Sequence, residues 1–181
     1  MALIILAHPN IKDSVANKTV IEELQQNNPD IEVRNIYELY PDFKIDPKTE
    51  QEALLKHNTI IFQYPFYWYN MPAILKHWFD VVYEYQFAFG SKGDKLKGKN
   101  FLSSFTIGGA ENEYKTFGEH NFRIHEFCKN LEQTAYKSKM TYIDPIYFYE
   151  TSLTAGFSSN NIKVKAINHA QRLLTLLEEL A

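Results

Sequence analysis

Short apolar runs of strand length recur along the chain and are separated by stretches with a different periodicity. The runs are rich in β-branched and aromatic residues, and they are too short to be buried helices. They extend over Ala2 to Leu6, Thr59 to Phe62, Phe101 to Thr106 and Thr141 to Phe148, and a more polar segment of similar length, Ile31 to Ile36, is a further predicted strand. Near-continuous apolar runs of this kind are typical of strands that are buried on both faces of a parallel sheet.

Between these runs, apolar residues recur at helical spacing. The helical stretches are Val15 to Leu24, Thr49 to Lys56, Met71 to Val82, Phe122 to Tyr136 and Val164 to Leu177. Alternation of strands and helices predicts right-handed crossovers and a parallel sheet with helices on both faces. We therefore expect an α/β fold, a three-layer sandwich whose five parallel strands take the flavodoxin-like order 2-1-3-4-5.

The 181 residues contain no Pro-, Gly- or Ser-rich linker and no break in composition, which predicts a single flavodoxin-like domain over residues 1–181. Hydrophobic residues make up 45% of the chain, enough for a sizeable core. No apolar run approaches the roughly 20 residues that cross a membrane. The opening Met1 to Pro9 lacks the basic region and cleavage site of a signal peptide, so we expect a first strand and a cytoplasmic location.

Composition also argues against several other classes of function. A formal net charge of −3 gives no reason to expect a nucleic-acid partner. The single cysteine, Cys128, cannot form an intramolecular disulfide, and its spacing from Ile124 and Leu131 suits an apolar helix face, which predicts a buried, inert thiol. The histidines are scattered, and His120 and His125 would lie on different faces of a helix, so no metal site is predicted.

An aromatic loop follows the third predicted strand. The segment Gln63 to Pro72 contains four consecutive aromatic residues, Phe66 to Tyr69, between a strand and a helix. Ligands of doubly wound folds sit at the carboxyl ends of the strands, in loops of this type. The cluster therefore favours a planar ligand, while packing of the four rings into the core is the alternative.

Two further loops should reach the same edge of the sheet. His8 to Asn17 leads into a helix with Asp13 or Ser14 as its N-cap, and free N–H groups at a helix start favour phosphate, as do donors such as His8, Ser14 and Asn17. A plain capped helix is the alternative. After the fourth strand, Gly108 and Gly109 allow close backbone approach to a ring, although a generic turn explains the pair equally well.

Several nucleotide and catalytic motifs are absent. The segment Gly93 to Asn100 nearly spells a phosphate loop, but Asn100 replaces the metal-binding Ser/Thr and a strand follows where a helix is required. The chain has no dinucleotide-binding Gly-x-Gly-x-x-Gly and no Gly-x-Ser-x-Gly elbow. Among aromatic ligands with a phosphate tail, a flavin remains.

Three of these motifs together resemble a known family, the flavodoxin-fold NAD(P)H:quinone oxidoreductases. They are Leu6-Ala7-His8-Pro9, Gln63 to Asp80 and Thr106-Ile107-Gly108-Gly109. Leu39 to Asp46 and Phe87 to Gly90 are most similar to the small bacterial members. Those members include general-stress-type reductases and ancillary subunits of glutathione-gated potassium efflux systems. The resemblance extends over nearly the whole chain.

The resemblance implies a homodimer with a flavin at the carboxyl edge of the sheet, FMN in preference to FAD, and an active site completed by the partner chain. It also implies NAD(P)H as electron donor. The implied flavin contacts are His8, Ser14, Ala16, Asn17, Pro65, Phe66, Tyr67, Trp68, Thr106, Ile107, Gly108 and Gly109. Tyr114 and His120 would act as a charge relay, and Tyr69 and Phe89 would bind substrate, Phe89 from the partner subunit.

The expected reaction has two steps, because one flat aromatic cleft would serve both substrates in turn. NAD(P)H would deliver hydride to the flavin and leave, and a quinone or related electrophile would then take two electrons, giving ping-pong kinetics. The alternative is a regulatory subunit that binds and activates a potassium-efflux antiporter. An electron-carrier flavodoxin is disfavoured, since such carriers have an acidic docking face and this chain has lysines at Lys92, Lys95, Lys97 and Lys99.

Overall fold

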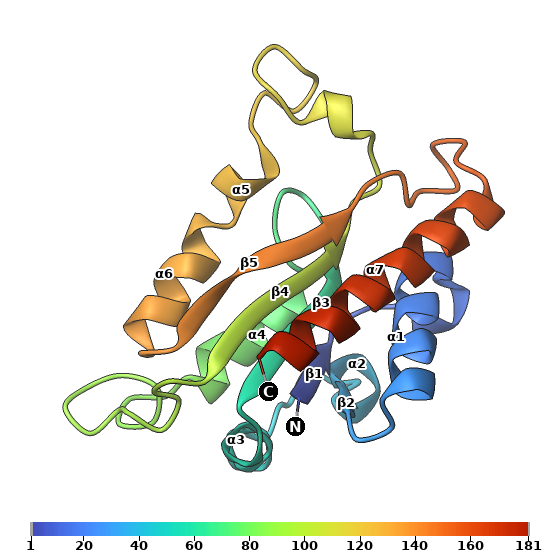
Figure 1. The fold of residues 1–181 in the computed structure, drawn as a ribbon. Coiled ribbons are helices and arrows are strands. Elements are labelled where there is room, and N and C mark those ends of the chain that lie inside the picture. The colour runs from blue at the N-terminus through green and yellow to red at the C-terminus, as the bar shows by residue number, and fades with distance from the viewer. Residues whose placement is uncertain (1, 181) are drawn as a thin grey trace.

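The computed structural model describes residues 2–180, and its strands form one parallel sheet (Figure 1). The strands are β1 (Ala2–Leu6), β2 (Glu32–Asn35), β3 (Thr59–Pro65), β4 (Asn100–Thr106) and β5 (Thr141–Phe148). Their order is β2-β1-β3-β4-β5, and every neighbouring pair is parallel. The predicted sheet order is confirmed.

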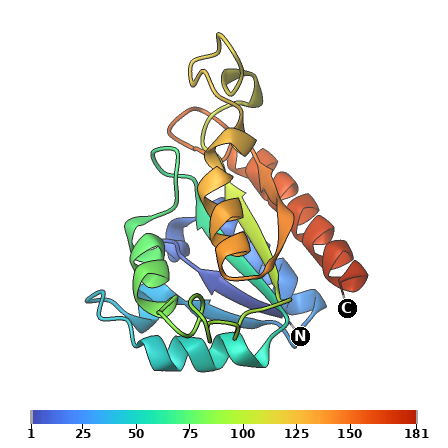
Figure 2. The same cartoon turned by 90° about the vertical axis from the view of Figure 1, so that its left-hand side faces the viewer.

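Helices cover both faces of this sheet (Figures 1 and 2). One face carries α1 (Val15–Asn27) and α7 (Ser159–Glu179), and the other carries α3 (Pro47–Lys56), α4 (Ala73–Val82) and α6 (Lys129–Lys137). Shorter elements are α2 (Ile36–Leu39), α5 (Ile124–Phe127) and the 3₁₀ turns η1 (Ile11–Asp13) and η2 (Glu111–Glu113). The three layers agree with the prediction.

Two apolar cores lie on either side of the sheet, because successive strand residues point to opposite faces. In β1, Leu3 and Ile5 pack toward α3 and α4, whereas Ile4 packs toward α1 and α7. The first core is rich in aromatic rings, with the centroid of Phe62 4.6 Å from that of Phe101. Much of the chain's aromatic content therefore forms the core and not a ligand site.

The predicted helix from Phe122 to Tyr136 is two helices, since α5 ends before Cys128 and α6 begins after it. The N–H of Cys128 donates to His125 O, three residues back, which tightens the chain into a 3₁₀-type turn at the junction. The Cys128 thiol is buried and donates to Ile124 O, and burial raises its pKa to about 12. A thiol held protonated in this way is a poor nucleophile, as expected.

A buried carboxylate joins the elements at the β2 side of the sheet. Glu50 of α3 is 0% exposed. Its Oε1 accepts from Arg34 Nη2 at 2.5 Å and from the Tyr40 hydroxyl at 2.7 Å. Its Oε2 accepts from Trp78 Nε1 at 2.9 Å. The carboxylate thus has a charged partner and two neutral donors, which a fully buried charge requires.

Within residues 2–180, no helix is long and apolar enough to span a membrane.

We predict that Glu50→Gln lowers the free energy of unfolding by about 3 kcal/mol, since it leaves the Arg34 guanidinium without its counter-charge. Urea denaturation measures this loss. The matched control is Glu132→Gln, which removes an exposed ion pair with Lys129 on α6 and should cost far less. Equal losses in the two variants would contradict a stabilising role for the buried pair.

Candidate functional site

A cavity of about 440 Å³ opens where the carboxyl ends of β1, β3 and β4 meet. The three loops that the sequence singled out contribute to its wall. Of the predicted flavin contacts, His8, Ser14, Ala16, Asn17, Pro65, Phe66, Tyr67, Thr106 and Gly108 line it. Asn10, Asp13, Val15, Thr151, Ser152, Leu153 and Thr154 complete the lining.

One end of the cavity is the N-terminus of helix α1. Ser14 is its N-cap, since the Ser14 Oγ accepts from the backbone N–H of Asn17 at 3.1 Å. First-turn N–H groups have no partner within their own helix, and the helix dipole makes this end positive. The Asp13 carboxylate, which also lines the cavity, accepts from Asn10 Nδ2 at 2.5 Å. The free amides and the helix dipole suit this end to an anion, whereas the Asp13 carboxylate, bound by Asn10, places a negative charge in the lining.

His8 adds a neutral donor to the same end. Its Nδ1 accepts from the backbone N–H of Asn10 at 3.1 Å, which places the ring hydrogen on Nε2. Burial lowers the pKa of His8, so the imidazole is uncharged at neutral pH. His8 can thus donate a hydrogen bond to a ligand without carrying a charge.

The other end of the cavity is aromatic. Phe66 is half-buried and stacks on Phe105, with centroids 5.6 Å apart, which fixes its ring against the sheet. Tyr67 beside it is exposed, and Pro65 belongs to β3. A cavity with an anion-binding end and an aromatic end fits a planar ring that bears a phosphate.

Trp68 does not line this cavity. Tyr67 and Asn70 exchange two backbone hydrogen bonds, at 2.9 and 3.0 Å, and so close a two-residue turn. Trp68 and Tyr69 have φ values of 46° and 63°, the left-handed region that such a turn requires and that bulky residues rarely adopt. The turn leaves Trp68 92% exposed and outside the cavity lining.

Ile107 and Gly109 support the wall from behind. The Ile107 side chain is buried in the core, and its backbone N–H donates to Phe148 O at 2.9 Å. A Cβ at Gly109 would lie 2.4 Å from Glu113 Oε2, an oxygen that accepts from the Ala110 N–H at 2.8 Å. Gly109 therefore makes room for a loop contact, whereas a Cβ at Gly108 would make only an ordinary contact with Ser152 at 3.4 Å.

Tyr114 and His120 lie together beside the aromatic end, with ring centroids 4.2 Å apart. His120 Nδ1 lies 3.3 Å from the Tyr69 hydroxyl, so its hydrogen-bond partner is Tyr69 and not Tyr114. Tyr114 contacts the imidazole through its ring and lies near Phe66, with centroids 6.3 Å apart. Burial raises the pKa of Tyr114 to about 12, so its hydroxyl remains a proton donor at neutral pH.

Phe89 is remote from these residues within one chain. It lies in the segment that precedes β4, at the amino end of the sheet, and lines a separate cavity with Tyr83 and Ala88 (Figure 1). A role for Phe89 near the 440 Å³ cavity could come only from a second copy of the chain.

The comparison with protein families agrees with the observed topology. The family model described as having a flavodoxin-like fold matches residues 1–174. The chain belongs to this flavodoxin-like family. No group of three or more His, Cys, Asp or Glu side chains that could hold a metal ion occurs between residues 2 and 180.

Several similar proteins come from bacteria. The uncharacterized NAD(P)H oxidoreductase YrkL of Bacillus subtilis (strain 168) is 39% identical over 176 residues, covering 97% of each chain. The ancillary protein KefF of the glutathione-regulated potassium-efflux system of Enterobacter sp. (strain 638) is 35% identical, covering 96% of each. The general stress protein 14 of Treponema denticola, crystallised in complex with FMN, superposes with a TM-score of 0.89 at 32% identity, covering 99% of each. These matches confirm the family resemblance.

Sequence reasoning missed two contributions to this flavodoxin-like site. The first is the Thr151 to Thr154 segment, whose hydroxyl-rich sequence directly after the last strand was a usable signal. The second is a buried polar chain beneath the cavity. Gln63 Nε2 donates to Asn17 Oδ1 at 2.8 Å, and Asn17 Nδ2 donates to Thr106 Oγ1 at 3.0 Å. Isolated polar residues in strands carry no sequence signal for such pairing.

We predict that Asn17→Ala lowers the free energy of unfolding by about 2 kcal/mol, because it leaves the buried Gln63 amide without an acceptor. Asn27→Ala on the same helix removes an exposed side chain and should change stability by less than about 0.5 kcal/mol. Urea midpoints of the two variants make the comparison. A similar, small effect at both positions would contradict the role assigned to Asn17.

Proposed function

We propose that this protein is an FMN-dependent NAD(P)H:quinone oxidoreductase. The observation that carries the proposal is the cavity at the carboxyl edge of the sheet, which joins an anion-binding helix terminus to an aromatic wall. The relative that was crystallised with FMN has this fold over 99% of its length. The NAD(P)H oxidoreductase YrkL supports a nicotinamide nucleotide as electron donor.

The residues present fit FMN at both ends of the cavity. Ser14 and Thr106, together with the first-turn amides of α1, would hold the phosphate, with Asn17 beneath them binding both hydroxyl oxygens, and His8 would add a donor. Pro65, Phe66 and Tyr67 would face the ring, with Gly108 on the opposite loop. Trp68, Ile107 and Gly109 do not line the cavity and would act on the shape of its loops.

A bound flavin would supply the redox chemistry, accepting hydride from the nicotinamide and passing two electrons to a quinone. The protein's own residues would orient the substrates and supply a proton donor. Tyr114 is protonated at neutral pH and lies beside Phe66, so its hydroxyl can hydrogen-bond to negative charge that develops on a ring there. His120 would hold Tyr69 and Tyr114 in place through its contacts with both.

Both substrates would use the same cleft in turn. Phe66, Tyr67 and Tyr69 offer flat, uncharged surface to any planar molecule, and this surface does not distinguish a nicotinamide from a quinone. Because the two substrates share the cleft, the first product must leave before the second substrate enters, which gives a ping-pong mechanism.

We predict that the purified protein retains FMN after gel filtration, that its visible absorbance bleaches with anaerobic NADPH and recovers with a benzoquinone, and that double-reciprocal plots are parallel. Tyr114→Phe and His120→Gln should slow the bleaching about 100-fold while leaving the dissociation constant of FMN unchanged. Tyr136→Phe, which alters an exposed tyrosine on α6, is the control. Failure to retain FMN would overturn the proposal, and intersecting plots would overturn the shared cleft.

A homodimer would cover the aromatic surface next to the cavity. Trp68 is 92% exposed and Phe117 is 96% exposed, and Phe122, which follows Phe117 closely in the sequence, is also exposed. The segment that carries η2 and Phe117 projects from the rest of the chain (Figures 1 and 2). Large exposed aromatic side chains are candidates for an interaction surface, and strained turns are common at functional sites.

We predict that the protein is a dimer in sedimentation equilibrium. Trp68→Lys and Phe117→Asp should each raise its dissociation constant by about thirtyfold, as expected when about 2 kcal/mol of interface energy is lost. Tyr136→Lys places the charge of Trp68→Lys on an exposed aromatic position of α6 and should leave the dimer unchanged. A monomeric wild-type protein would contradict the proposed interface.

The similarity to KefF favours a second candidate function, an ancillary role on a potassium-efflux antiporter. The two functions are compatible, because the cavity occupies one edge of the sheet and leaves other surfaces for a partner. An adjacent gene for a multi-span cation antiporter would favour this role, and its absence would favour a free-standing enzyme.

A further inference from the structure

The buried polar chain beneath the cavity continues across the sheet to helix α7. The Ser104 hydroxyl donates to Gln63 Oε1 at 2.5 Å, and Ser104 Oγ lies 2.7 Å from His169 Nε2. A continuous series of hydrogen bonds therefore runs from His169 through Ser104, Gln63 and Asn17 to Thr106 in the cavity wall. All of these side chains are buried.

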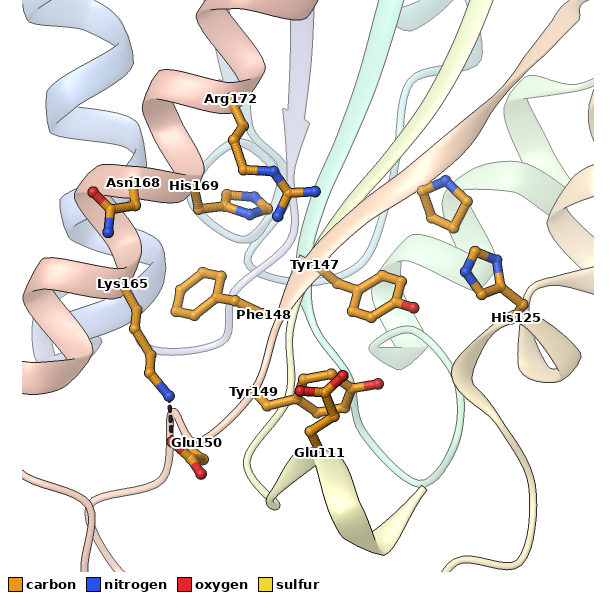
Figure 3. A pocket seen from close by; sticks show the side chains of 11 residues that line it. Glu111, His125, Tyr147, Phe148, Tyr149, Glu150, Lys165, Asn168, His169 and Arg172 are labelled. Carbon is orange, nitrogen blue, oxygen red and sulfur yellow. Dashed lines mark hydrogen bonds and ion pairs between the residues drawn. The ribbon is translucent and has the colours of Figure 1, made fainter. Parts of the chain in front are cut away.

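His169 is the far end of this chain. It projects from α7 and lies beside Phe148 and Arg172 at a second cavity (Figure 3). The side chain is 1% exposed, and its Nδ1 has no hydrogen-bond partner among the described residues. Burial and the charge of Arg172 lower the pKa of His169 to about 3, so the ring is neutral and carries one hydrogen.

The positions of the atoms are compatible with two directions of donation along the chain. In the first, His169 Nε2–H donates to Ser104, and each group donates onward until Asn17 Nδ2 donates to Thr106. In the second, both amides are reversed, Thr106 donates toward Asn17, and Ser104 donates to His169 Nε2. The second direction requires the ring hydrogen of His169 to sit on Nδ1.

The surroundings of Nδ1 decide between these directions. A hydrogen on Nδ1 would be a buried donor without an acceptor, which folded proteins rarely tolerate. With the hydrogen on Nε2, Nδ1 carries only an unused lone pair, a lesser penalty. The first direction is therefore favoured, because no acceptor lies within reach of His169 Nδ1 among the described residues.

The direction determines what the cavity offers a ligand. In the first direction Asn17 Nδ2 donates to Thr106 Oγ1, and it lies 3.4 Å from Ser14 Oγ, which also accepts the Asn17 backbone N–H. Both hydroxyl oxygens thus act as acceptors toward Asn17, and their hydrogens are left to point into the cavity. In the reversed direction the Asn17 oxygen would compete for those hydrogens.

We propose that His169 is a positioning residue for the phosphate of the cofactor: by donating from Nε2 to Ser104 it orients the buried chain so that Ser14 and Thr106 act as donors into the cavity. The inference rests on the proposed FMN-dependent function. A phosphate dianion accepts hydrogen bonds and has none to donate, so it depends on this orientation. The terminal hydroxyl of riboflavin can either donate or accept a hydrogen bond, so the binding of riboflavin does not depend on this orientation.

The test compares FMN with riboflavin, whose dissociation constants are measured by quenching of flavin fluorescence. His169→Leu should raise the dissociation constant of FMN about tenfold, the factor that corresponds to about 1.4 kcal/mol, and leave that of riboflavin unchanged. Ser104→Ala breaks the chain at the next link and should act likewise, which keeps the test available if His169→Leu does not fold.

Two controls separate orientation from packing. His169→Gln places an amide N–H where Nε2–H lies and should retain the wild-type preference for FMN. Asn168→Ala changes the adjacent residue at the same second cavity and should also retain it. If the ratio of the FMN and riboflavin dissociation constants is unchanged in His169→Leu and Ser104→Ala, the inference about His169 is overturned and the proposed function still stands. Absence of FMN binding by the wild-type protein would overturn the proposed function as well.

Discussion

The need to satisfy the Gln63 side chain links the sheet to the candidate site. Gln63 lies on the central strand β3 and is completely buried, so its amide must find both a donor and an acceptor inside the protein. Ser104 of β4 supplies the donor and Asn17 of α1 supplies the acceptor. The same contacts place the N-terminus of α1 against the loop after β4, and this juxtaposition forms the anion-binding end of the cavity.

A second buried polar centre acts at the β2 side of the sheet. There Glu50 binds Arg34, Tyr40 and Trp78, which belong to different elements. The residues of this centre do not line the cavity, and the centre contains a charge, whereas the chain through Gln63 consists of neutral groups. Neutral amides and hydroxyls keep their hydrogen-bonding pattern over a wide pH range, which suits a scaffold for an anionic ligand.

The aromatic loop illustrates how one sequence motif can divide between several tasks. Phe66 packs against the sheet, Tyr67 lines the cavity, and Trp68 points outward from a strained turn. Tyr69 stacks on Phe127 of α5 and reaches His120. The turn costs conformational energy, and the proposed dimer interface would offer a physical reason for that cost.

Sequence alone determined the alternation of strands and helices, the sheet order and most of the cavity wall. It could do so because burial on both faces imposes a continuous apolar pattern on parallel strands, and because parallel strands bring their carboxyl-end loops to one edge. That rule predicted that Ser14, Asn17, Phe66 and Thr106 lie at one edge of the sheet, and all four line the cavity there.

Only the tertiary structure decided where Trp68 and Phe89 lie, which hydroxyl His120 contacts, and that His169 is joined to the cavity. The pairing of Ser104 with His169 joins residues 65 positions apart in the sequence, and the direction of the Trp68 side chain depends on two backbone angles within one turn. Hydrophobic periodicity specifies which face of an element is buried. It carries no information on which buried polar groups meet across that face, because pairing depends on distances that arise only when the layers are packed together.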